Sequence, residues 1–196
     1  MQNMVESMNS FIKNQSENPW DTAIFGDIYH LSNDARGKFG EQIISSLLHI
    51  LDWEIQNDVS DETIRADGHY DIKANNLRLE VKTACYGTCG AWQHEPLYDN
   101  AVFNACDYVV FLDFHYNHYY LTVCKSIDLP LGGRSNIPMF GNKHGTLRKN
   151  KDNGYKFDFS NTTIKNVLNA GICKQFSAED SLNTVAEWFN ECFKEK

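Results

Sequence analysis

The chain lacks the long apolar runs that a membrane helix requires. No stretch of its 196 residues approaches the roughly 18 to 20 apolar residues needed to cross a bilayer. Residues 1–15 contain neither an apolar core nor a small-residue cleavage site, so we expect no secretory signal, no membrane contact and a cytoplasmic location. Internal repeats and low-complexity tracts are also absent. With 42% hydrophobic and 22% charged residues, the composition indicates a folded globular protein.

Positive charge is scarce. The chain has 18 Lys and Arg residues against 26 Asp and Glu residues, which gives a net charge of −8. Bulk electrostatics therefore do not indicate a nucleic-acid-binding protein, and any such binding has to depend on a local site. Positive charge gathers only in residues 143–156, where five basic residues against one acidic residue give +4.

The six cysteines include only one closely spaced pair, Cys85 and Cys89. We interpret the cysteines as reduced thiols, several of them inside apolar strands. The alternative is a structural zinc site, which would need two more ligands from His69, His94 or the distant cysteines.

The hydrophobic pattern predicts a mixed α and β domain built on one central sheet. Residues 1–33 are interpreted as an N-terminal arm or short helix, and residues 34–196 as a single domain. Residues 85–97 and 126–160 are predicted to be mostly loop. The expected helices cover residues 35–51, 98–105, 161–169 and 178–193, and the expected strands cover residues 52–59, 68–73, 77–83, 107–113 and 118–124.

Charged side chains that could act in catalysis are concentrated in residues 71–84. Asn75-Asn76 within this segment predicts a two-residue hairpin turn. The resulting register places Asp71 directly opposite Glu80, with Cβ atoms about 5 Å apart. Two carboxylates at that separation repel each other unless a cation neutralises them, and hard oxygen ligands suit Mg²⁺ or Mn²⁺. Lys82 lies one step along the same face.

The same strands allow a plainer interpretation. Diagonal ion pairs between Lys73 and Glu80 and between Asp71 and Arg78 would make this a solvated sheet face without a metal.

A third carboxylate, Glu41, lies in the first turn of the helix predicted over residues 35–51. It borders the apolar face, where a side chain can reach the edge of the core. Gly37 and Gly40 are predicted on the packed side, where glycine permits close approach to a strand. Alternatively, Glu41 only favours the helix dipole as a first-turn acid.

Together, a helical Glu41, then Asp71, eight residues, and Glu80-Val81-Lys82 in a strand resemble the PD-(D/E)XK nuclease superfamily. That superfamily includes most type II restriction endonucleases. The resemblance covers residues 35–124, where the predicted elements follow the family's αβββαβ order. Tyr70 stands where the family name has proline.

The resemblance implies a Mg²⁺-dependent endodeoxyribonuclease of sequence-specific restriction type, which forms a homodimer, cuts double-stranded DNA and leaves 5′-phosphates. Asp71, Glu80 and the backbone carbonyl of Val81 would hold Mg²⁺, for which Mn²⁺ can substitute. Lys82 would position the attacking water and help to deprotonate it. Glu41 matches the helical acid that binds metal directly or through water.

Other functions remain open at this point. The same residues fit a structure-specific nuclease of recombination or repair, a homing endonuclease, or a catalytically silent DNA-binding module of the same fold. A zinc-stapled interaction protein would use Cys85 and Cys89. The absence of a G-x-x-x-x-G-K-S/T motif excludes a helicase motor.

DNA contacts are expected outside the catalytic set. Gln93 or His94 follows the Lys82 strand, where it could contact the scissile phosphate or a base. Arg134, in a Gly-Gly-Arg-Ser-Asn stretch, suits backbone contacts or base reading. The main phosphate-contacting residues are expected within residues 143–156, namely Lys143, Arg148, Lys149 and Lys151. The alternative is a solvated basic loop.

We therefore predict that single alanine substitutions at Lys143, Lys149 and Lys151 weaken binding to all DNA sequences alike. Each lost phosphate contact should reduce the slope of log K against log salt by about 1. Salt titrations of binding in Ca²⁺ or EDTA measure this slope without cleavage. Unchanged affinity and slope in these variants and in Arg148→Ala would show that the segment is only a solvated loop.

Overall fold

The computed structural model describes residues 18–57, 70–98, 106–128, 147–149 and 154–194. Within these ranges no helix is both long and apolar enough to cross a membrane. The helices are 3₁₀ segments η1 (Pro19–Thr22) and η2 (Ser126–Asp128), and α2 (Gly26–His30), α3 (Asn33–Ile50), α6 (Asn161–Asn169) and α7 (Leu182–Glu191). The strands are β1 (Ile55–Asn57), β2 (Ile72–Ala74), β3 (Leu77–Cys85), β4 (Ala91–Tyr98), β5 (Tyr108–Phe114), β6 (His118–Lys125), β7 (Leu147–Lys149), β8 (Gly154–Ser160) and β9 (Cys173–Ser177).

Six strands form a central mixed sheet in the order β1-β2-β3-β5-β6-β9. Strands β3 and β5 run parallel, and every other neighbouring pair is antiparallel. A second sheet has the order β4-β8-β7. The predicted fold class, a mixed sheet flanked by helices, is confirmed.

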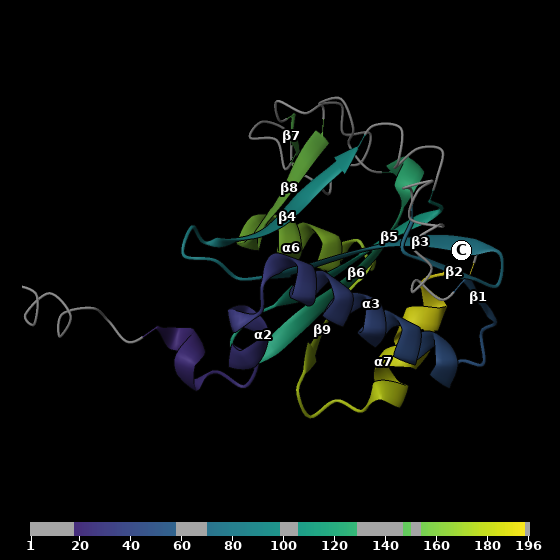
Figure 1. Ribbon diagram of the computed structural model, residues 1–196, viewed down its shortest axis with the longest axis horizontal. Helices are drawn as coiled ribbons and strands as arrows, with labels where there is room; N and C mark the ends of the chain where they lie inside the picture. The colour runs from purple at the N-terminus through teal and green to yellow at the C-terminus, as the bar shows by residue number, and fades with distance from the viewer. Residues whose placement is uncertain (1–17, 58–69, 99–105, 129–146, 150–153, 195–196) are drawn as a thin grey trace, which may run out of the picture.

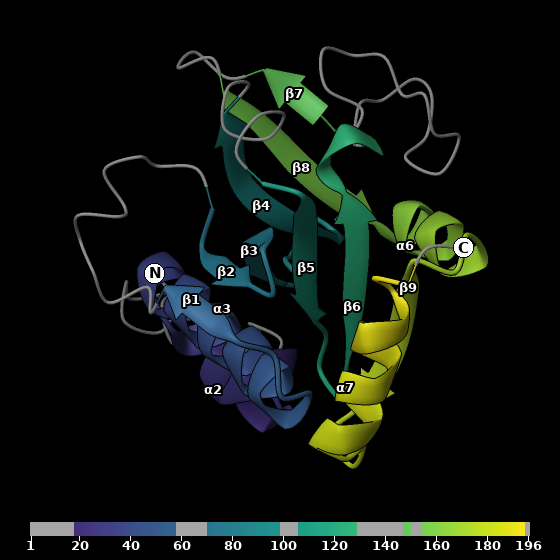
Figure 2. The ribbon, with the colours of Figure 1, turned by 90° about the vertical axis from the view of Figure 1, so that its right-hand side faces the viewer.

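The central sheet separates two apolar cores, because side chains alternate between its faces. On one face Leu79 and Val81 of β3 pack with α3 and α7. On the other face Phe111 of β5 packs with Trp92 of β4, Phe159 of β8 and residues of α6. Figures 1 and 2 show α3 and α7 on one side of the sheet and β4 and β8 on the other.

Part of the expected N-terminal arm packs onto the domain. Trp20 is buried, and its indole N–H donates a hydrogen bond to the carbonyl of Tyr86 at 3.1 Å. Its ring stacks on Tyr29, and the Arg36 guanidinium of α3 donates to the carbonyls of Ile28, Tyr29 and Leu31. Residues 18–33 are therefore tied to α3, and residues 1–17 lie outside the described ranges.

Two predicted loops contain strands instead. Residues 85–97 were expected to be irregular, but Ala91–Tyr98 forms β4, and the expected loop over residues 126–160 contains all of β7 and β8. Strand β9 was also missed. Strands β4 and β9 pair with partners distant in sequence, β8 and β6, and such pairing leaves little local pattern. Strand β7, by contrast, pairs with the nearby β8. The helix expected over residues 98–105 lies outside the described residues apart from Tyr98, which belongs to β4.

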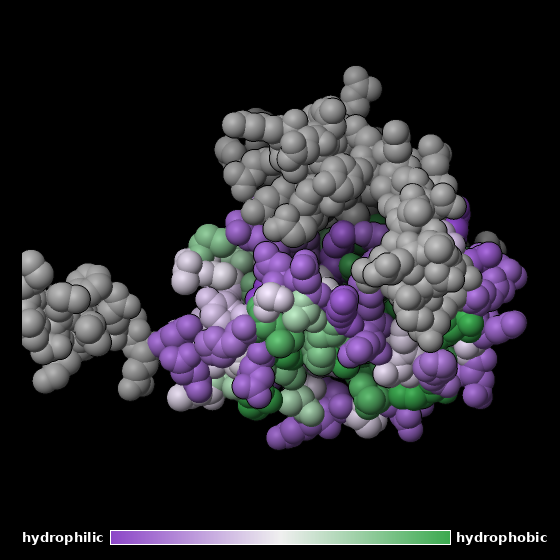
Figure 3. Space-filling view, in the orientation of Figure 1, coloured by the Kyte–Doolittle hydropathy of each residue, from purple (hydrophilic) through white to green (hydrophobic). Residues whose placement is uncertain are grey.

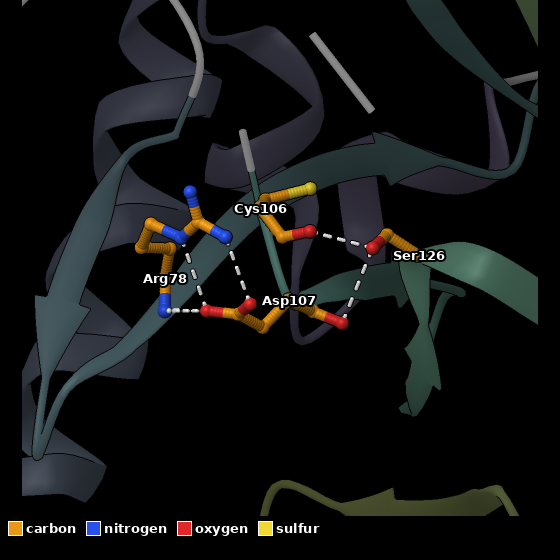
Figure 4. Close-up of polar contacts among 4 residues, drawn as sticks. All are labelled: Arg78, Cys106, Asp107 and Ser126. Carbon is orange, nitrogen blue, oxygen red and sulfur yellow. Dashed lines mark hydrogen bonds and ion pairs between the residues drawn. The ribbon is translucent and has the colours of Figure 1, made fainter. Parts of the chain in front are cut away.

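Three strands of the central sheet are tied together by polar contacts around Asp107 (Figure 4). The Asp107 carboxylate accepts from the Arg78 guanidinium at 3.0 and 3.2 Å and from the Arg78 backbone N–H at 2.8 Å. These bonds lower the pKa of Asp107, an effect that burial opposes. The Ser126 hydroxyl donates to the Cys106 and Asp107 carbonyls. Arg78 thus pairs with β5 rather than diagonally with Asp71.

Figure 3 shows hydrophilic and hydrophobic residues side by side on this face of the molecule. The large apolar side chains exposed among the described residues are Ile24, Leu31, Ile50 and Leu182.

The two glycines of α3 differ in environment. A Cβ atom built on Gly40 would lie 1.8 Å from the Thr83 hydroxyl oxygen, so glycine here lets α3 pack closely against β3. A Cβ atom on Gly37 would have no neighbour within 4 Å in the described part of the chain. The expectation that both lie on the packed side is right for Gly40 and wrong for Gly37.

We predict that Gly40→Ala lowers the free energy of unfolding by about 1–2 kcal/mol, because overpacking outweighs the better helix propensity of alanine. The Gly40→Ala/Thr83→Ala double variant should recover most of this loss, because it removes the colliding hydroxyl. Urea denaturation of the wild type, both single variants and the double variant measures the coupling. Equal or higher stability of Gly40→Ala would contradict the close packing.

Candidate active site

The site is organised by a difference in strand length. Strand β2 pairs with β3 over three residue pairs, from Ala74 opposite Leu77 to Ile72 opposite Leu79. Along its other edge, β3 pairs with β5 as far as Cys85. Beyond Leu79, no described strand of the central sheet pairs with the β2 side of β3. Backbone groups of β3 therefore face an opening at this edge.

The hairpin register is confirmed for its three pairs nearest the turn. Asn75 and Asn76 have φ angles of 46° and 66°, which suits a tight two-residue turn. The expected fourth pair, Asp71 with Glu80, does not belong to the ladder. The Asp71 N–H donates to the Leu79 carbonyl at 2.9 Å, and the Asp71 carboxylate accepts from the Val81 N–H at 2.7 Å.

This bond holds the Asp71 carboxylate against the open edge of β3. In a strand, the N–H and C=O of one residue point to the same edge. Because the Val81 N–H reaches Asp71, the Val81 carbonyl also faces the β2 side, where the ladder has ended. The structure thus places a carboxylate and a backbone carbonyl at the same edge.

Glu80 meets Lys82 on its own strand rather than Lys73 on β2. The Lys82 Nζ atom lies 2.6 Å from Glu80 Oε1, and their side chains are only 20% and 15% exposed. Burial disfavours the Lys82 ammonium, but the carboxylates of Glu80 and Asp71 outweigh burial and raise the pKa of Lys82 above its ordinary value. Lys82 is therefore a cation that balances the charge of Glu80.

These residues line one cleft of about 660 Å³. Helix α3 supplies Glu41 from one wall, the β2–β3 hairpin supplies Asp71, Glu80 and Lys82, and Gln93 of β4 also borders the cleft. The structure thus brings together the four residues that the sequence proposed as catalytic, although their roles stay a prediction. Among the described residues, four carboxylates and three basic side chains line the cleft, which gives these residues a formal charge of −1 with histidine neutral: Asp34, Glu41, Asp71 and Glu80 against Arg36, Lys38 and Lys82.

The first turns of α3 were missed by the sequence analysis. Asn33, Gly37 and Glu41 follow each other at intervals of four, so they share one helix face, and all three line the cleft. Asp34 and Lys38 flank that face and line the cleft too. Stepping backward from Glu41 at helical spacing would have found them.

His94 borders the cleft but is not presented to a ligand in the expected way. Its ring is fully buried, and Nε2 lies 2.8 Å from Asp113 Oδ1, which is also fully buried. Burial raises the pKa of Asp113, and His94 opposes this shift. Gln93, by contrast, is exposed. Of these two β4 candidates, only Gln93 has an exposed side chain.

The predicted DNA-contacting segment is described only in part. Arg134, Lys143 and Lys151 lie outside the described residues. Arg148 and Lys149 belong to β7, where they pair with Lys156 and Tyr155 of β8 at the edge of the second sheet. The DNA-contacting role of Arg148 and Lys149 stays a prediction.

Across the described ranges, no three His, Cys, Asp or Glu side chains are already arranged as a metal centre. Cys85 is buried, which raises the pKa of its thiol to about 11, whereas Cys89 is exposed. At the open edge the donor chemistry does suit a hard divalent cation, because two carboxylates and the Val81 carbonyl are oxygen donors in a cleft of net negative charge.

No protein-family profile and no curated protein matches the sequence. A solved structure described as "Restriction endonuclease in complex with substrate DNA" aligns with 97% of this chain and 90% of its own, at a TM-score of 0.41 and 11% identity. A likeness at this level establishes neither a shared fold nor a shared activity.

We predict that Glu80→Gln lowers the stability of the metal-free protein by about 1–3 kcal/mol. The substitution leaves the mostly buried Lys82 ammonium without its counter-ion, and the partial exposure of the pair reduces the cost relative to full burial. Thermal unfolding in EDTA measures the effect, with the exposed Glu179→Gln as the matched control. Higher stability of Glu80→Gln would mean that repulsion from Asp71 outweighs the bond to Lys82.

Proposed function

We propose that the protein is a metal-dependent endodeoxyribonuclease that hydrolyses phosphodiester bonds in double-stranded DNA. The observation that supports this best is the cleft at the open edge of β3, which collects Glu41, Asp71, Glu80 and Lys82 from three elements. Oxygen donors beside one lysine are the groups that metal-assisted phosphodiester hydrolysis requires. The catalytically silent alternative would have no need to keep this set.

In the proposal, Asp71, Glu80 and the Val81 carbonyl hold Mg²⁺, and Glu41 contributes directly or through water. Mn²⁺ can substitute for Mg²⁺, since both take oxygen ligands. When bound, the ion neutralises charge on the phosphoryl oxygens and activates water. The hydrogen bond from the Val81 N–H holds the Asp71 carboxylate at this edge, which supports its proposed role as a ligand.

Lys82 has two tasks in this account. It balances Glu80 in the protein without ligand, at an Nζ–Oε1 distance of 2.6 Å. If Mg²⁺ binds Glu80, the Lys82 ammonium would be able to donate hydrogen bonds to the attacking water and to a phosphoryl oxygen. These bonds would orient the nucleophile. The same charge helps an anionic strand to enter a cleft that is otherwise net negative.

The finer proposal is a restriction enzyme that acts as a homodimer on one DNA sequence and leaves 5′-phosphates. Structure-specific cleavage in recombination or repair, or by a homing endonuclease, would use the same cleft. Incubation of mixed genomic DNA with Mg²⁺, followed by sequencing of the fragment ends, separates these functions. One repeated end sequence supports restriction. If the genomic DNA stays uncut, a branched DNA junction is incubated in parallel, and cleavage of the junction alone supports a repair or recombination enzyme.

We predict that Lys82→Met reduces cleavage of plasmid DNA in Mg²⁺ by at least about 100-fold, because the water-orienting cation is lost. Binding of duplex DNA in Ca²⁺ should change much less, since methionine preserves most of the buried volume. Lys125→Met, at an exposed position outside the cleft, is the matched control and should cleave normally. Cleavage by Lys82→Met at the wild-type rate would show that this is not the active site.

A further inference from the structure

Gly37 is a glycine for which neither packing nor backbone conformation accounts. A Cβ atom there would meet no atom within 4 Å among the described residues. Gly37 lies inside α3, and the glycines with positive φ in the described chain are Gly90 and Gly171. An alanine would therefore fit at position 37 without collision or strain.

Glycine at this position weakens the helix. It loses more backbone freedom on folding than alanine does, so a helix interior is less stable with glycine. At Gly40, three residues later, this loss of helix stability is offset because the glycine lets α3 pack closely against Thr83. Gly37 gains no such contact with any residue that the structure describes. A local loss of stability without a packing gain is expected where a ligand needs the space.

The position of Gly37 in the cleft indicates what kind of ligand would occupy this space. It lies one helical turn from both Asn33 and Glu41, and all three line the cleft. The missing side chain leaves a notch in the helix wall immediately beside Glu41, with the exposed Lys38 at its margin. A chain that passes through this notch contacts the helix backbone, places negative charge near Lys38 and continues toward Asp71 and Glu80.

We infer that Gly37 is where the sugar–phosphate backbone of the bound DNA strand comes closest to α3. This inference rests on the proposed nuclease function and adds a position that determines affinity. Any side chain at residue 37 projects into the path of the strand. The loss of affinity should therefore grow with side-chain size, while the stability of the free protein does not fall.

The test compares Gly37→Ala and Gly37→Leu with Ser46→Leu. Ser46 is exposed on the same helix and is not among the described residues that line the cleft. Ser46→Leu therefore places a leucine side chain on α3 away from the proposed DNA path. Binding is measured by fluorescence anisotropy with a labelled random-sequence duplex in Ca²⁺, and stability is measured by thermal unfolding without DNA.

We expect Gly37→Ala to raise Tm by about 2 °C, as a helix-interior alanine should in a chain of this size. Its Kd for the duplex should increase nonetheless. Gly37→Leu should increase Kd by at least about tenfold, which corresponds to blocking one close contact. Ser46→Leu should bind as the wild type does. Higher stability with weaker binding separates a blocked ligand path from a folding defect.

Each other result overturns the inference. If the wild type binds duplex DNA and Gly37→Leu binds equally well, Gly37 does not adjoin the strand, although the proposed function stands. If Gly37→Ala lowers Tm, the protein itself requires the glycine. If the wild type does not bind duplex DNA at all, the proposed function fails and this inference fails with it.

Discussion

The candidate site depends on one constraint: β2 is only three residues long, whereas its antiparallel neighbour β3 is nine residues long. A strand edge inside a domain is normally covered by a neighbouring strand, because unpaired backbone groups are costly to bury. Here no strand in the described part of the chain covers the edge beyond Leu79, and this edge faces a cleft. Asp71 covers part of it by accepting the Val81 N–H, so the residue that ends the ladder is also a candidate ligand. Helix α3 reaches the same edge because Gly40 lets it pack closely on Thr83.

Electrostatic balance is the second feature of the site. A cleft lined by Asp34, Glu41, Asp71 and Glu80 would be unstable without cations, and Lys82 supplies one at 2.6 Å from Glu80. In the proposed function, the same arrangement would let an acidic protein approach DNA. A bound divalent ion would change the formal charge of the described lining residues from −1 to +1, which would favour an anionic strand. Metal binding and DNA binding are therefore expected to depend on each other in this account.

Sequence reasoning predicted what local pattern encodes. The range 161–169 was predicted for a helix and is α6, and the Asn75-Asn76 hairpin has the expected register next to the turn. Strand β4 was missed because it pairs with β8 across some 60 intervening residues. The orientation of the Asp71 carboxylate was missed for another reason. A two-residue turn fixes the pairs beside it, but it does not determine where the ladder ends. Likewise, the different roles of Gly37 and Gly40 depend on how α3 is rotated against β3, which helical periodicity resolves only coarsely.

The central claim is that the open edge of β3 binds a divalent cation, and Mn²⁺ binding measured by electron paramagnetic resonance without DNA tests it most directly. The account predicts that the wild type binds Mn²⁺ and that Mg²⁺ displaces it. Asp71→Asn should lose this binding, whereas an exposed carboxylate outside the cleft, tested as Glu179→Gln, should not matter. A wild-type protein that binds no Mn²⁺, or an Asp71→Asn variant that binds it equally well, would contradict the account.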